Sequence, residues 1–139
     1  MREILFRGKR LDNGEWVKGC YYKQDFFYGD KKEVHYIIES NEVLSNDYAL
    51  LARAVDPATV GQYTGLTDKN GKRIFEWDVV DILAENEEIG VVTYDDGGFW
   101  VEADGFCVDF HHNIYGTELE IIGNIHDNPE LHNSGGKST

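Results

Sequence analysis

The chain has 139 residues, of which 41% are hydrophobic and 13% aromatic, and its 26 acidic and 13 basic residues give a formal net charge of −13. This composition excludes a disordered acidic protein, because it supplies enough apolar side chain for a buried core. The negative charge repels a phosphate backbone, so nucleic acid is disfavoured as a direct partner.

No secretion signal or membrane span is predicted near the start, because the apolar run at residues 4–6 is too short for either. We therefore expect a cytoplasmic protein. Cys20 and Cys107 lie far apart in the sequence and lack the paired spacing of metal ligands. In a reducing compartment they should remain buried thiols.

Short strands separated by tight turns account for the first part of the chain. By the two-residue repeat of a strand, Ile4 and Phe6 share one face, and Val34, Tyr36 and Ile38 share another. Turn signals lie at residues 12–14 (Asp-Asn-Gly), 70–71 (Asn-Gly) and 96–98 (Asp-Gly-Gly), and such residues tolerate the positive φ of hairpin turns. The pattern predicts an all-β, mainly antiparallel fold.

Helical structure is expected at two places only. The apolar residues between 41 and 54 do not alternate, which predicts a short helix capped by Ser40. Asp56 and Pro57 predict a single helical turn, with Asp56 as the N-cap and Pro57 at the first helical position. That turn should link the two halves of the chain.

The second half is more regular, with strands expected near residues 74–75, 79–84, 89–94, 99–103 and 119–125. Five short strands joined by tight turns can curl into a small SH3-like barrel. We expect one β-rich domain over residues 1–131, in which an N-terminal meander (1–56) packs on the barrel (57–131). The segment 132–139 has no apolar residue to anchor it and is expected to be disordered.

Two blocks of sequence resemble the YopX family of phage and prophage proteins. They are GQYTGLTDKNGKRIFEWDVV at residues 61–80 and IIGNIHDNPEL at 121–131, with weaker support from the opening REILFRGKRLDNGEWVKG. The resemblance implies a β-rich phage or prophage protein and supplies no catalytic residue. Trp77 stands where the family signature has glycine, so a positive φ there would be strained.

The sequence contains no convincing catalytic, cofactor or metal-binding constellation. Asp109 and His111 would share one face of a strand, and His112 and His126 are further candidate ligands for a small metal-dependent hydrolase. Two ligands do not close a metal site, however, and neither cysteine lies in a nucleophile motif. We therefore expect a protein that is not an enzyme and has no cofactor.

Aromatic residues give the stronger functional signal, and four of them form the predicted interaction surface: Trp77, Tyr94, Trp100 and Phe110. They favour a non-enzymatic interaction or accessory protein that binds a protein partner or self-associates. The alternatives are a nucleic-acid-associated SH3-like or OB-like module acting through Trp77 or Trp100, an acidic DNA mimic that inhibits a host protein, and the hydrolase. Alternation places Phe99 and Trp100 on opposite faces of their strand.

Overall fold

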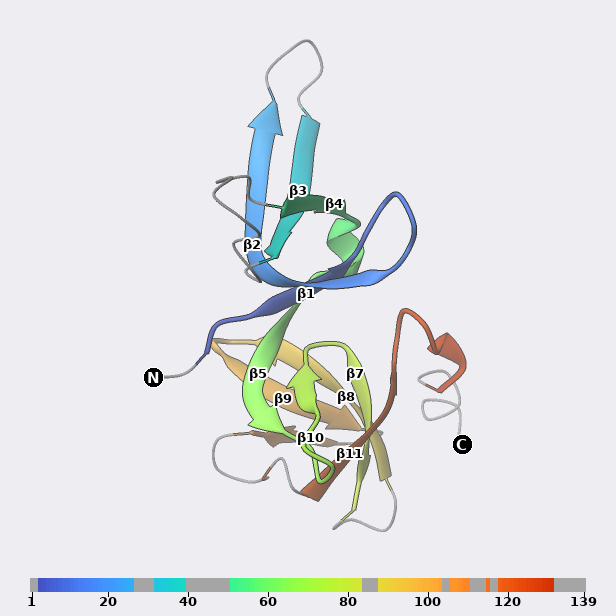
Figure 1. The fold of residues 1–139 in the computed structure, drawn as a ribbon. Coiled ribbons are helices and arrows are strands. Elements are labelled where there is room, and N and C mark those ends of the chain that lie inside the picture. Colours follow the sequence, from blue (N-terminus) through green and yellow to red (C-terminus); the bar gives the residue numbers. More distant parts are fainter. Residues whose placement is uncertain are drawn as a thin grey trace. The chain divides into compact units, whose positions relative to one another are not determined.

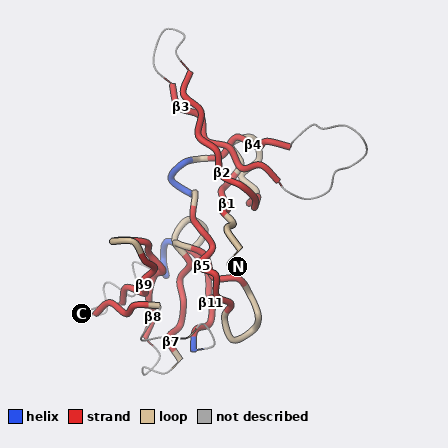
Figure 2. Tube along the Cα trace, turned by 90° about the vertical axis from the view of Figure 1, so that its left-hand side faces the viewer, coloured by secondary structure: helices blue, strands red, loops and turns tan. Residues whose placement is uncertain are grey.

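The computed structural model describes residues 3–26, 32–39, 51–83, 88–103, 106–110, 115 and 118–131. Strands make up most of the trace (Figure 1, Figure 2), and the strand pairings found are antiparallel. Helical structure in this part of the chain comprises a short 3₁₀ helix, a turn at residues 129–131 and a single helical residue at Glu118. The prediction of an all-β fold is confirmed.

Contacts divide the chain into two compact units, residues 1–62 and 63–139. The single domain expected over residues 1–131, with its division after residue 56, stays a prediction. Residues 132–139, where a disordered tail was predicted, lie outside the described residues.

The first unit contains strands β1 (Phe6–Lys9), β2 (Trp16–Phe26), β3 (Lys32–Glu39) and β4 (Leu51–Val55), which pair in the order β4-β3-β2-β1. An isolated bridge between Arg10 and Val55 then joins the end of β1 to β4. There the N–H of Leu11 donates to the carbonyl of Ala54 at 3.0 Å. The sheet of this unit is therefore closed on itself at one point, and its core holds Val17, Ile37 and Val55.

The helix predicted between residues 41 and 54 is wrong for its last four residues, which belong to β4; residues 41–50 lie outside the described part of the chain. Ala52 pairs with Ile38 and Ala54 with Tyr36 on β3. Pairing with β3 buries Val55 and overrides the local pattern, as tertiary context often does.

The predicted helical turn is confirmed as the 3₁₀ helix η1 (Pro57–Thr59), with Pro57 at its start. The carboxylate of Asp56 accepts a hydrogen bond from the N–H of Ala58 at 3.1 Å. The hydroxyl of Thr59 in turn accepts from the N–H of Lys9 at 2.8 Å, which ties the turn to β1.

The second unit is built on the strands that follow. Strand β5 (Gly61–Thr67) begins in the first unit beside β1 and ends in the second, where it pairs with β6 (Arg73–Phe75). Strands β7 (Asp78–Ile82), β8 (Glu88–Asp95), β9 (Gly98–Ala103), β10 (Phe106–Asp109) and β11 (Leu119–Asn124) form a sheet in the order β10-β9-β8-β7-β11. The SH3-like barrel expected here stays a prediction.

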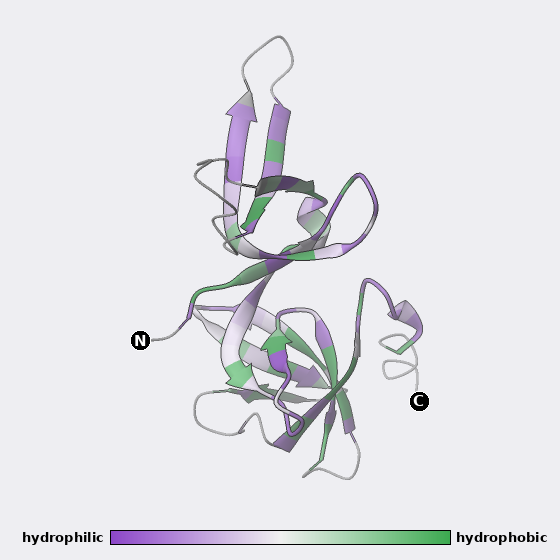
Figure 3. Ribbon diagram, in the orientation of Figure 1, coloured by the Kyte–Doolittle hydropathy of each residue, from purple (hydrophilic) through white to green (hydrophobic). Residues whose placement is uncertain are grey.

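The core of the second unit is formed by one face of this sheet together with Ile74 from β6. Its buried members from the sheet and its connections are Val80, Ile82, Val92, Phe99, Val101, Phe110 and Leu119. Hydrophobic residues of this unit lie along its strands in Figure 3. The β8–β9 hairpin turns at Asp96 and Gly97, whose φ values of 52° and 79° are those expected of a tight primed turn.

Candidate interaction surface

The four predicted surface aromatics do not share one face. Tyr94 is 47% exposed and pairs opposite Phe99, with ring centroids 4.9 Å apart. Trp100 points to the other face of the β8–β9 hairpin, where its indole N–H donates to the carbonyl of Asp95 at 2.9 Å. Phe110 is 5% exposed and lies in the core. Phe110 therefore cannot contact a partner at the surface.

Trp77, the fourth, adopts a left-handed backbone conformation with φ 77° in the turn between β6 and β7. Its N–H donates to the carbonyl of Val92 at 2.7 Å, and its carbonyl accepts from the N–H of Ile125 at 3.0 Å. The indole ring meets the ring of His126 edge-on at 6.5 Å. Position 77 therefore has the positive φ that glycine tolerates, as the family signature implies. Placing tryptophan in this left-handed conformation costs about 1–2 kcal/mol of folding free energy.

Asp68 joins the two sequence blocks that carry the family resemblance. It is 2% exposed. One carboxylate oxygen accepts from the N–H groups of Asn70 and Lys72, both at 2.9 Å, and the other from the N–H of Ile121 at 3.0 Å. Burial alone would raise the pKa of Asp68. The three backbone N–H donors and the charge of nearby Lys72 have the larger combined effect, so the pKa lies below its usual value. These conspicuous motif residues therefore hold the fold together.

The hydrolase alternative depends on four residues, two of which lie outside the described part of the chain. Asp109 lies on β10 opposite Trp100, and His126 lies in the turn after β11. His111 and His112 fall outside the described residues. Among the residues that the structure does describe, no three His, Cys, Asp or Glu side chains are grouped to hold a metal ion, and no helical segment has the length and apolar character that crossing a bilayer requires.

A surface that the sequence did not reveal lies on the sheet of the first unit. One side of β2, β3 and β4 faces away from the core. Strand register places eight neighbouring residues at the centre of that side, and we call these eight the outer face: Cys20, Tyr22, Gln24, Val34, Tyr36, Ile38, Ala52 and Ala54. None of these eight is charged and none is buried, but the same side of the sheet continues into exposed lysines at its ends, Lys18 on β2 and Lys32 on β3. Tyr22 and Tyr36 are directly opposite each other at its centre, and Tyr22 is 49% exposed.

Alternation along β3 predicted one shared face for Val34, Tyr36 and Ile38, and this is correct. That face is the outer one, however, because Ile37 is the fully buried residue of the strand. The expected burial of the two thiols is wrong: Cys20 on the outer face and Cys107 on β10 are both exposed. At Cys107, burial of part of the thiol and the carboxylate of Glu102 opposite it raise the pKa.

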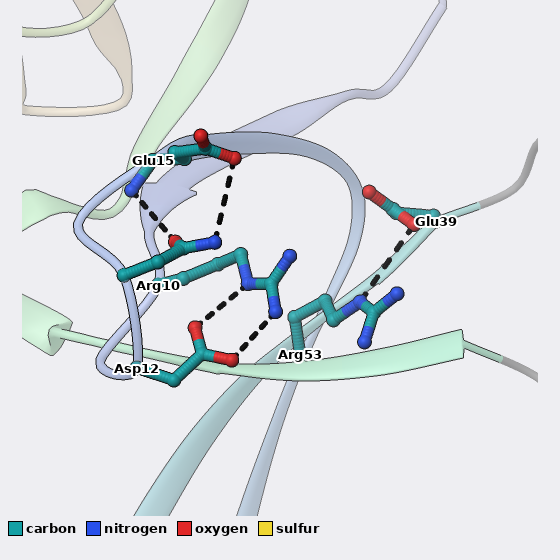
Figure 4. Close-up of polar contacts among 6 residues, drawn as sticks. Arg10, Asp12, Glu15, Glu39 and Arg53 are labelled. Carbon is teal, nitrogen blue, oxygen red and sulfur yellow. Dashed lines mark hydrogen bonds and ion pairs between the residues drawn. The ribbon is translucent and has the colours of Figure 1, made fainter.

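A shallow pocket of about 180 Å³ adjoins the outer face at the edge of β4. Its lining consists of Arg10, Leu11, Asp12, Ala52, Arg53 and Ala54. Arg10 is held by Asp12 through two hydrogen bonds, from Nε at 2.8 Å and from Nη2 at 2.6 Å (Figure 4). These bonds raise the pKa of Arg10 and lower the pKa of Asp12. Arg53 faces Glu39 at 3.9 Å.

Comparison with known proteins agrees with this fold. The crystal structure of protein EF1440 from Enterococcus faecalis is similar, with a TM-score of 0.58 and 25% sequence identity over 94% of this chain and 99% of that chain. No curated protein sequence matches. The profile of the YopX protein family matches residues 5–132, which include both sequence blocks joined by Asp68. The chain belongs to the YopX family.

Proposed function

We propose that this YopX protein is a non-enzymatic interaction or accessory protein of phage or prophage origin that acts in the cytoplasm and self-associates through the outer face. The observation that carries the proposal is that eight neighbouring residues at the centre of that side of the sheet are uncharged, with charge only at its ends, in a chain in which 28% of residues are charged. The phage or prophage origin rests on the family alone.

The residues in the two sequence blocks that carry the family resemblance give no support to an enzymatic role, since they have clear structural tasks. Asp68 binds three backbone N–H groups, and the turn at Trp77 is tied to β8 and to the end of β11. A carboxylate engaged in this way has its pKa lowered, whereas a general acid or base working near neutral pH needs it raised.

A second copy of the chain is the partner that we propose for the uncharged outer face. Two copies with a net charge of −13 each repel one another, so their contact should exclude charged groups from its centre. A two-fold arrangement of outer faces satisfies this condition, because it places the same uncharged surface on both sides. The exposed Tyr22 is suited to be the anchor, since tyrosine is enriched among the residues that dominate interface energies.

Light scattering of the purified protein at low and high salt tests the proposal. We expect a dimer that becomes stronger at high salt, because salt screens the repulsion between acidic copies. Tyr22→Glu should weaken the dimer at least about tenfold. Tyr115→Glu is the matched control, since Tyr115 is 76% exposed in the other unit and should leave the mass unchanged. A monomer at every salt concentration, or an equal effect of both variants, would contradict self-association through the outer face.

The same experiment with single-stranded DNA separates the competing reading. A mass that changes only with DNA, and only at low salt, would favour a nucleic-acid-associated module instead.

A further inference from the structure

The pocket at the edge of β4 combines two guanidinium groups with a small apolar floor. Arg10 and Arg53 supply the cations, and Leu11, Ala52 and Ala54 complete the lining with Asp12. Leu11 is 64% exposed, so its side chain is available to cover a ligand. The N–H of Leu11 donates to the carbonyl of Ala54, and the turn at residues 11–13 then leads the chain away from β4. The pocket lies at this point.

Arg53 has more hydrogen-bonding capacity than its surroundings use. Its Nε is buried and has no hydrogen-bond partner among the residues that the structure describes. The carboxylate of Glu39 is 3.9 Å away, which is too long for a hydrogen bond. A guanidinium group presents five donors in a planar fork that matches a carboxylate, and leaving such donors unused at a partly buried site costs free energy.

Arg10 is the fixed member of the pair. Its two bonds to Asp12 hold the guanidinium in one orientation, so a ligand that also reaches it loses little side-chain freedom. Asp12 and Glu39 together offset the charges of Arg10 and Arg53, which leaves the pocket close to neutral. A neutral pocket disfavours a dianion such as phosphate and tolerates a single negative charge.

We infer that this pocket binds a carboxylate carried on a small apolar group, with the carboxylate on Arg53 and the edge of Arg10 and the apolar group against the exposed side chain of Leu11. Two ligands share this chemistry, the C-terminus of a polypeptide ending in a small residue and a free short-chain acid. Ala52 and Ala54 belong to the outer face as well, so the site adjoins the surface proposed for self-association, but the two arginines lie outside that face and binding does not require a second copy.

Titration of the ¹⁵N-labelled protein, followed by NMR, tests the site. The probes are N-acetyl-alanine, its uncharged C-terminal amide, isobutyrate and inorganic phosphate. We expect the two carboxylates to shift the amide signals of residues 10–12 and 52–54, while the amide probe and phosphate leave them in place. Tighter binding of N-acetyl-alanine than of isobutyrate would identify a chain terminus as the ligand, and the reverse order a free acid. Equal shifts with the amide probe, or binding of phosphate alone, would overturn the inference.

A loss of binding could also result from misfolding, so we choose two substitutions that should change the affinity in opposite directions. Arg53→Gln should weaken N-acetyl-alanine binding about 10- to 100-fold, because a charge-assisted pair is lost. Glu39→Gln should strengthen it about fivefold, because a competing carboxylate is removed from beside Arg53. Lys32→Gln removes an exposed cation from the far end of β3 and should change nothing. Unchanged affinity in both Arg53→Gln and Glu39→Gln would refute the assignment.

Discussion

Asp68→Asn offers the sharpest test of how this fold is held together. The substitution keeps one oxygen, which can still accept from the N–H groups of Asn70 and Lys72, and places an amide group where Ile121 needs an acceptor. A buried backbone N–H left without an acceptor costs about 1–3 kcal/mol, and the two retained bonds each weaken when the acceptor loses its charge. We therefore expect the free energy of unfolding to fall by about 2–4 kcal/mol, a large part of the 5–15 kcal/mol typical of a domain.

Urea denaturation followed by circular dichroism measures this loss as a shift of the midpoint. The control is Asp56→Asn, because the carboxylate of Asp56 accepts a single bond at the exposed cap of η1 and asparagine caps helices about as well as aspartate. A change of less than about 0.5 kcal/mol for Asp68→Asn, or an equal change in the control, would refute the reasoning.

The pH dependence gives a second readout on the same residue. Because the folded-state pKa of Asp68 lies below the ordinary value of 3.8, its carboxylate stabilises the fold fully at pH values above 3.8 and loses this contribution as the pH falls through the folded-state pKa. The difference in stability between the protein and Asp68→Asn should therefore be constant from neutral pH down to about pH 5 and shrink below about pH 4. A difference that grows on acidification would contradict the direction of the pKa shift.

Two further substitutions test the strained turn and the exposed thiol. Trp77→Gly should change the free energy of unfolding by no more than about 1 kcal/mol. Relief of the left-handed backbone conformation offsets the loss of the ring contact and the greater flexibility of glycine. Trp100→Gly has no positive φ to relieve and should lower the free energy of unfolding by about 2–3 kcal/mol in the same denaturation assay. Equal losses would show that no strain is released. Glu102→Gln should speed alkylation of Cys107 at pH 8 roughly two- to fivefold, because the pKa of Cys107 falls and more thiolate forms. Mass spectrometry measures the rate, with Cys20 as the internal reference. An unchanged rate would show that Glu102 does not control the thiol.

What the sequence predicted correctly was local. The turn at Asp96 and Gly97 and the capped turn at Pro57 follow from φ preferences of a few residues, and strand alternation follows from the two-residue repeat. These features are sufficient to identify an all-β chain.

What the sequence could not show depends on pairing between distant segments. The strand at residues 51–55 exists because β3 lies beside it, and Ile37 is the core residue of β3 because of the packing of Val17 and Val55 around it. The outer face likewise requires the register of three strands to be known before its eight uncharged positions can be seen together. The pocket needs, in addition, the bridge that brings Arg10 to β4.

The bond between the carboxylate of Asp68 and the N–H of Ile121 spans 53 residues of sequence, and this separation sets the order of events during synthesis. At 5–20 residues per second, a ribosome needs roughly 3 to 10 s to pass from one residue to the other. Until then β7 lacks its neighbour β11, and Asp68 must rely on water for one of its bonds. The first unit, whose pairings are complete by Gln62, has no such delay. The nascent chain therefore carries a finished N-terminal sheet while β7 in its second sheet is still unpaired on one side, and during this interval a chaperone or a misplaced strand can bind there.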